Sequence, residues 1–125
     1  MTKLTFPDSA VSEYCASETF QPRCPHNEVV VVISALYGRM RIGRCVQTDL
    51  GFLGCAMDVL SLTDQRCSGL QTCQIRLPDQ IFDQTTPCFH ELKTYLEVSY
   101  RCIPGRQRSA YALYMYSIQN SQYVR

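Results

Sequence analysis

The chain has 125 residues, a length that suits one compact domain, and its formal net charge is +1 with lysine and arginine scattered along it. This charge excludes the basic surface that a nucleic-acid-binding domain needs. No apolar run approaches the roughly 20 residues required to cross a bilayer, so we expect no direct membrane insertion of this segment.

The eight cysteines, in a small domain without tryptophan, predict a disulfide framework. Such a framework indicates an extracellular location, since the cytosol keeps thiols reduced. Zinc is the alternative, but no two cysteines have zinc-ligand spacing and only His26 and His90 could join them. We therefore predict no metal and no cofactor. Residues 1–14 lack the apolar core of a signal peptide, so we expect the sequence to be a piece of a longer extracellular protein.

The first recognisable element is residues 28–35, EVVVVISA, where β-branched residues predict a strand. The overlapping stretch 34–39, SALYGR, is interpreted as a turn, because Gly38 can adopt backbone angles closed to residues with a Cβ. Tyr37 is then a packed turn aromatic, and the alternative is that its ring presents a surface to a ligand. Residues 45–55 contain two glycines and no clear period, which indicates a loop held by a cysteine at each end.

The second half of the chain predicts a helix and two strands. Residues 55–67 have apolar side chains at helical spacing and predict a short amphipathic helix. Residues 72–82 predict a strand that stops at Pro78, which cannot donate to a ladder. Residues 93–102 alternate and predict a strand with one buried face. The apolar positions of the predicted helix are Ala56, Val59, Leu60 and, more weakly, Thr63.

The order of the cysteines, together with YGR at 37–39, Pro-Cys at 87–88 and YLEV at 95–98, resembles the galactose/rhamnose-binding lectin family, also called the sea-urchin-egg-lectin (SUEL) type. The resemblance covers about residues 10 to 103. It implies an α+β fold class, a small disulfide-rich domain with an antiparallel β-sheet, two helices and long pinned loops.

The resemblance and the composition together predict three segments. Residues 1–9 are an N-terminal flank, and residues 10–104 are the SUEL-type lectin domain. Residues 105–125 follow Pro104-Gly105, which favours a domain end. Their apolar positions fit neither a helix face nor strict alternation. An edge strand, a linker and a tail disordered in isolation all remain open for this segment.

The resemblance also implies a disulfide pairing. The implied pairs are Cys15 with Cys45, Cys24 with Cys102, Cys55 with Cys88, and Cys67 with Cys73. The residues alone leave many pairings open. They favour only the last pair, because the glycine-containing SGLQT between its two cysteines can close a tight loop.

A sugar site follows from the same resemblance. In sugar-binding members a glutamate after the first cysteine, the tyrosine of YGR, an aspartate before Pro-Cys and a lysine after it contact one sugar. In this chain Tyr37, Gly38 and Arg39 match YGR, and Lys93 stands at the lysine position. Counting back from the YLEV stretch instead places Thr94 there.

Both family carboxylates are missing from this sequence. Ala16 stands at the glutamate position and Thr86 at the aspartate position. Glu18 and Glu91 are candidate substitutes, although neither is at the matching position. Because hydrogen bonds to charged acceptors are among the strong ones, we expect a weakened or altered sugar pocket.

Two functions therefore stay open. The first is carbohydrate binding, to a galactose-like, rhamnose-like or acidic glycan, through an altered pocket. The second is a protein–protein interaction module of a cell-surface adhesion or receptor ectodomain on the same scaffold. Arg39, Arg41 and Arg44 could form a basic patch for an acidic partner, or could simply be solvated. The predicted binding residues are Tyr37, Gly38, Arg39, Arg41, Thr86 and Lys93.

The same residues argue against an enzyme. The sequence shows no nucleophile beside a base, no carboxylate pair and no metal-ligand set. The cysteines are expected to be paired, and a paired sulfur cannot attack a substrate.

Overall fold

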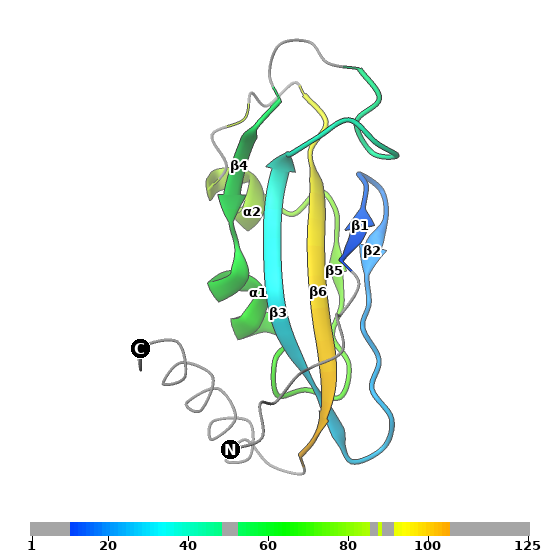
Figure 1. Cartoon of the computed structure of the whole chain (residues 1–125). Helices are drawn as coiled ribbons and strands as arrows, with labels where there is room; N and C mark the ends of the chain where they lie inside the picture. The colour runs from blue at the N-terminus through cyan, green and yellow to red at the C-terminus, as the bar shows by residue number, and fades with distance from the viewer. Residues whose placement is uncertain (1–10, 49–52, 86–87, 89–91, 106–125) are drawn as a thin grey trace, which may run out of the picture.

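The computed structural model describes residues 11–48, 53–85, 88 and 92–105. These residues form a four-stranded sheet in the order β1-β6-β3-β4, a two-stranded sheet β2-β5 and two helices, α1 and α2 (Figure 1). The predicted α+β fold class is confirmed. The elements are β1 (Ser12–Tyr14), β2 (Thr19–Phe20), β3 (Glu28–Arg39), β4 (Cys55–Asp58), α1 (Leu60–Cys67), β5 (Ile75–Arg76), α2 (Gln80–Thr85) and β6 (Tyr95–Pro104).

Strands β3 and β6 form the backbone of the sheet. They pair antiparallel from Glu28 opposite Pro104 to Gly38 opposite Tyr95, with one irregularity after Val32. In Figure 1 the two strands run side by side along almost the whole described domain, with both helices visible on the β4 side of β3. The β-branched run predicted this strand pair, because such side chains pack well on a pleated surface.

The prediction of a turn at 34–39 is wrong, because β3 continues to Arg39. Gly38 has a φ of 151°, and a Cβ built on it would lie 2.2 Å from the carbonyl oxygen of Cys55 on β4. The absence of a side chain at Gly38 therefore allows β4 to approach β3 closely.

The predicted helix at 55–67 is correct only from Leu60 onward, since Cys55–Asp58 is strand β4. These residues pair with the outer edge of β3, with Ala56 opposite Gly38. Long-range pairing thus overrides the local helical pattern. Val59 and Thr63 do face the core as the periodicity predicts, and both are almost fully buried.

The predicted strand within 72–82 is short, β5, and it ends before Pro78 as expected. Helix α2 follows it within the remainder of that range. The Asp79 carboxylate accepts hydrogen bonds from the amides of Ile81 and Phe82, so it caps the first turn of this helix. Phe82 is fully buried and anchors the helix in the core.

The last predicted strand is confirmed as β6, but the prediction of a single buried face is wrong. Tyr95, Glu97 and Ser99, on the second face, are also buried. The loop after β3 covers the first two, because the Arg41 amide donates to the Tyr95 hydroxyl and its guanidinium binds Glu97 at 2.7 Å. The hydroxyl groups of Ser34 and Ser99 lie 2.6 Å apart.

Four disulfides join these elements, and they are the pairs that the resemblance implies. They connect Cys15 with Cys45, Cys24 with Cys102, Cys55 with Cys88, and Cys67 with Cys73. The apolar core lies between the sheet and the helices, and its largest members include Phe20, Tyr37 and Phe82. The flank 1–9 and most of the segment 105–125 lie outside the described residues, so those boundaries stay predictions.

None of the helices in the described part of the chain is long and apolar enough to span a membrane.

Candidate functional site

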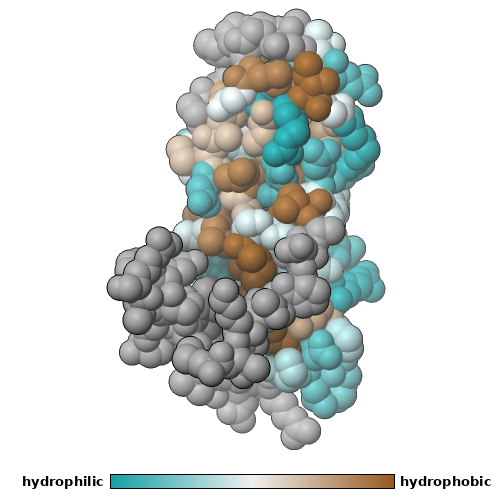
Figure 2. All heavy atoms as spheres, in the orientation of Figure 1, coloured by the Kyte–Doolittle hydropathy of each residue, from teal (hydrophilic) through white to brown (hydrophobic). Residues whose placement is uncertain are grey.

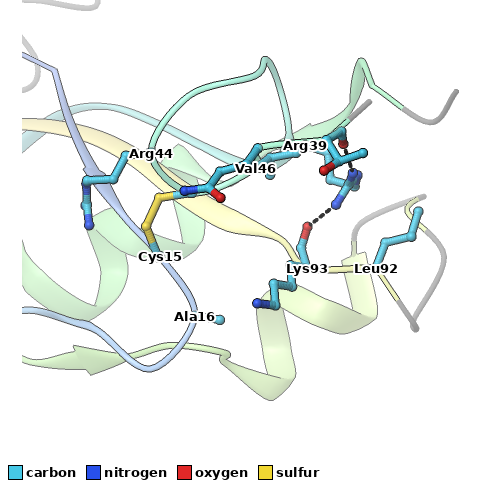
Figure 3. Close-up of a pocket in the computed structure, with 10 residues that line it drawn as sticks. Cys15, Ala16, Arg39, Arg44, Val46, Leu92 and Lys93 are labelled. Carbon is cyan, nitrogen blue, oxygen red and sulfur yellow. Dashed lines mark hydrogen bonds between the residues drawn. A yellow bond between two sulfur atoms is a disulfide. The ribbon is translucent and has the colours of Figure 1, made fainter. Parts of the chain in front are cut away.

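A cavity of about 490 Å³ lies at the end of the sheet where β3 stops and β6 starts. Four segments build it: the turn after β1, the last residue of β3, the loop that follows, and the residues before β6 (Figure 3). The disulfide Cys15–Cys45 holds the first and third of these together. The lining residues are Cys15, Ala16, Arg39, Arg44, Cys45, Val46, Gln47, Thr48, Leu92 and Lys93.

Arg39 is the best-buried charged residue of this lining, with 3% of its surface exposed. Its Nη1 donates to the main-chain oxygen of Lys93 at 2.7 Å, and its Nη2 donates to that of Thr48 at 3.3 Å. Its Nε has no hydrogen-bond partner among the residues that the structure describes. The guanidinium therefore joins two walls of the cavity through carbonyl groups.

Lys93 reaches the cavity from the opposite wall. Its ammonium group points toward Ala16 in Figure 3, while its main-chain oxygen faces Arg39. The neighbouring Thr94 instead donates its hydroxyl hydrogen to the Tyr37 hydroxyl at 2.8 Å. Of the two alternatives for the lysine position, the structure thus brings Lys93 beside Ala16.

Tyr37 is fully buried and does not line the cavity. Its hydroxyl donates to Asp83 Oδ1 at 2.6 Å, and its ring lies 5.3 Å from that of Phe82. Burial, followed by the Asp83 hydrogen bond, raises the pKa of this hydroxyl. The Tyr37 ring is packed in the core as predicted, but it belongs to strand β3 and not to a turn. The alternative prediction, that the ring is exposed to a ligand, is wrong. Gly38 likewise faces β4.

Arg41 and Arg44 do not form a common basic patch with Arg39. Arg41, whose side chain is 57% exposed, pairs with Glu97 at 2.7 Å and does not line the cavity. Arg44 does line the cavity and pairs with Glu18 through two hydrogen bonds of 2.7 and 3.0 Å. Carboxylates thus balance both exposed arginines.

Glu18 does not take the place of the missing glutamate. Its carboxylate accepts from the Cys15 amide at 2.7 Å and from Arg44, outside the cavity lining. Thr86, Glu91 and His90 lie outside the described residues, and His26 is exposed. Within the described ranges no group of three or more His, Cys, Asp or Glu could hold a metal ion.

Sequence reasoning missed the wall formed by Val46, Gln47 and Thr48. The implied Cys15–Cys45 disulfide could have indicated this wall, because it places the residues after Cys45 beside Ala16, the glutamate position. No side-chain type in this stretch drew attention to it.

The Glu18–Arg44 ion pair should make a pH-dependent contribution to the stability of the domain. Hydrogen bonds from Arg44 and from the Cys15 amide lower the pKa of Glu18 from 4.5 to about 2. A lowered pKa contributes stability that is present above pH 4.5 and is lost as the pH falls through 2. In a carboxyl ¹³C NMR titration, Arg44→Ala should return the pKa of Glu18 toward 4.5, whereas Arg41→Ala should not. A Glu18 pKa near 4.5 in the parent protein would contradict the pair.

A small disulfide-stapled α+β domain with a polar cavity at the end of its sheet belongs to the class of binding modules, as lectin domains do. A family described as the D-galactoside/L-rhamnose binding SUEL lectin domain matches residues 22–102. The chain belongs to this family. It is a carbohydrate-binding family without catalytic activity, so the chain is not an enzyme.

Curated relatives agree with this assignment. The chain is 38% identical over 84 residues to the L-rhamnose-binding lectin CSL1 of Oncorhynchus keta, covering 62% of this chain and 28% of that protein. It is 30% identical over 95 residues to protein eva-1 homolog C of Mus musculus, covering 72% of this chain and 21% of that protein. The human eva-1 homolog C is 27% identical over the same length. The chain therefore spans between a fifth and a third of these relatives.

Proposed function

We propose that this domain, residues 10–104, is an extracellular carbohydrate-recognition module whose site is the cavity at the end of the sheet. The observation that carries the proposal is the meeting of Ala16 and Lys93 across that cavity. By the resemblance, these two residues correspond to positions that the lectin family uses for its sugar.

The size and chemistry of the cavity support this function. Its volume of about 490 Å³ is within the range of small-molecule sites. Lys93 supplies hydrogen-bond donors and Gln47 supplies both donors and an acceptor, which are groups that recognise sugar hydroxyls. Two disulfide-linked cysteines, Cys15 and Cys45, form part of the wall and keep it preorganised. Four disulfides also suit an extracellular location.

The pocket is altered from the family pattern in two ways. Ala16 offers no acceptor where the family has glutamate, and the buried ring of Tyr37 offers no stacking surface. Neutral sugars therefore lose, at position 16, a charged acceptor that would contribute roughly 1.5–3 kcal/mol.

Galactose and rhamnose should accordingly bind with a Kd of about 1 mM or weaker. Titration of ¹⁵N-labelled protein, followed by amide shifts of residues 15–16, 44–48 and 92–93, measures this affinity. Lys93→Ala should weaken the binding further. The matched control is Arg23→Gln, an exposed arginine beside Cys24 at the opposite end of β3, and it should bind like the parent. Micromolar binding of either neutral sugar would contradict the altered pocket.

The alternative function is a protein–protein interaction module of a cell-surface adhesion or receptor ectodomain. The absence of a carboxylate at Ala16 favours it, because the residue most specific to sugar binding is gone. On the face shown in Figure 2, hydrophobic side chains lie in several small groups separated by hydrophilic ones, and no continuous apolar area stands out. A glycan array without any bound saccharide, on folded protein, would favour this alternative.

A further inference from the structure

Arg39 is a buried cation without a counter-ion among the described residues. The residue is 3% exposed, and it takes part in none of the ion pairs among the described residues. Two carbonyl groups accept hydrogen bonds from Nη1 and Nη2, and Nε has no partner in the described part of the chain. A buried charge is costly unless an opposite charge compensates it, so this arrangement calls for an anion.

Lys93 adds a second positive charge to the same cavity. The third cation of the lining, Arg44, is already neutralised by Glu18. Among the described residues that line the cavity there is no carboxylate, because alanine stands at position 16. The described lining therefore carries an excess of about two positive charges, those of Arg39 and Lys93.

We propose that the cavity binds the acidic group of a saccharide, either a carboxylate or a sulfate ester. This inference rests on the proposed carbohydrate-binding function and names its ligand class. The Lys93 ammonium can donate short, strong charge-assisted hydrogen bonds to an anion in the cavity, and the buried Arg39 guanidinium adds a second positive charge that attracts it. The acidic ligand then supplies a negative charge in place of the glutamate that sugar-binding members of the family carry at the position of Ala16.

The remaining lining favours a sugar as the carrier of that charge. Gln47 and Thr48 add polar groups beside the two cations, and Val46 and Leu92 add apolar contact. Hydroxyl groups and the apolar ring face of a saccharide match this mixture. A short acidic peptide is the competing ligand, and it enters the experiment as a separate arm.

The experiment compares sugars that differ mainly in charge. Galactose, galacturonic acid and galactose 6-sulfate are titrated into ¹⁵N-labelled protein, followed by the amides of 15–16, 44–48 and 92–93. Both acidic sugars, or one of them, should bind about tenfold or more tightly than galactose, as one added charge-assisted hydrogen bond implies. Raising the salt concentration should reduce that advantage, because ions screen the attraction. The two acidic arms distinguish carboxylate from sulfate.

Two variants test the charge argument directly. Ala16→Glu restores a carboxylate to the wall and should weaken binding of the preferred acidic sugar about tenfold, without weakening that of galactose. Lys93→Gln keeps a similar length and should also weaken the acidic sugar. Arg23→Gln is the control and should leave both affinities unchanged. Thermal melting of each variant shows that it is folded.

Asp49 and Glu91 neighbour the lining residues Thr48 and Leu92 in sequence and lie outside the described residues. Asp49→Asn and Glu91→Gln should leave binding of the acidic sugar unchanged or strengthen it. Weaker binding in either variant would show that the carboxylate takes part in recognition, and this would overturn the proposal.

The outcomes separate this inference from the proposed function. Equal binding of galactose and both acidic sugars at the cavity would overturn the inference and leave the proposed function standing. No binding of any of these sugars would overturn both. A glutamate-rich peptide that binds at the same amides more tightly than the acidic sugars would overturn the choice of a saccharide.

Discussion

Replacing Tyr37 with alanine should lower the free energy of unfolding by about 3–5 kcal/mol, the range for removing a large buried aromatic side chain. The ring is fully buried beside Phe82, and its hydroxyl holds Asp83 of helix α2 and Thr94 before β6. The substitution leaves a cavity and two polar groups without this partner. Denaturant unfolding, monitored by circular dichroism, measures the loss.

Tyr37→Phe separates the ring from the hydroxyl. It keeps the packing and should cost about 1–3 kcal/mol, because Asp83 and Thr94 lose a part-buried hydrogen bond. Tyr37→Ala with an unfolding free energy within about 1 kcal/mol of the parent would contradict the packing role.

Removing the Cys24–Cys102 disulfide should have the second large effect. The bond joins residues 78 positions apart, and closing a loop of that size restricts the unfolded chain strongly. In the chain-entropy account, Cys24→Ala with Cys102→Ala should cost about 4 kcal/mol. Guanidinium unfolding under non-reducing conditions, which preserve the other three bonds, measures it.

The Cys67–Cys73 disulfide provides the matched control, since it spans only six positions. Cys67→Ala with Cys73→Ala should cost about 2 kcal/mol in the same account. A larger loss for the short loop than for the long one would show that contacts in the folded state, and not the restriction of the unfolded chain, dominate. Cys67 is fully buried, so this comparison is a demanding one.

Local sequence predicted the two long strands because their signal is local. The run of valines in β3 and the alternation in β6 require no knowledge of neighbours. The end of β3 could not be predicted in this way. Gly38 followed by an arginine is typical of a turn, and only the pairing with Ala56 on β4 shows that the glycine admits another strand.

The candidate site was likewise predictable only in part. The resemblance assigned Lys93 and Ala16 to sugar-binding positions, and both residues line one cavity. It did not reveal that Arg39 is buried. Residues 38–44 contain three arginines and two glycines, a composition typical of a solvated loop. The burial of Arg39 depends on the carbonyl groups of Lys93, which is distant in sequence, and of Thr48, which lies in an irregular segment. Such contacts have no periodic pattern in the sequence.

The Cys24–Cys102 bond also has a mechanical consequence. A force applied between Val11 and Gly105 passes through this covalent link, so residues 25–101 lie off the shortest covalent path between those two points. Pulling can extend only the short segments 11–24 and 102–105, so strand β3 and residues 95–101 of β6 carry no tension along their length. The cavity wall at Arg39 and Lys93 would therefore keep its shape under a load applied at the ends of the domain.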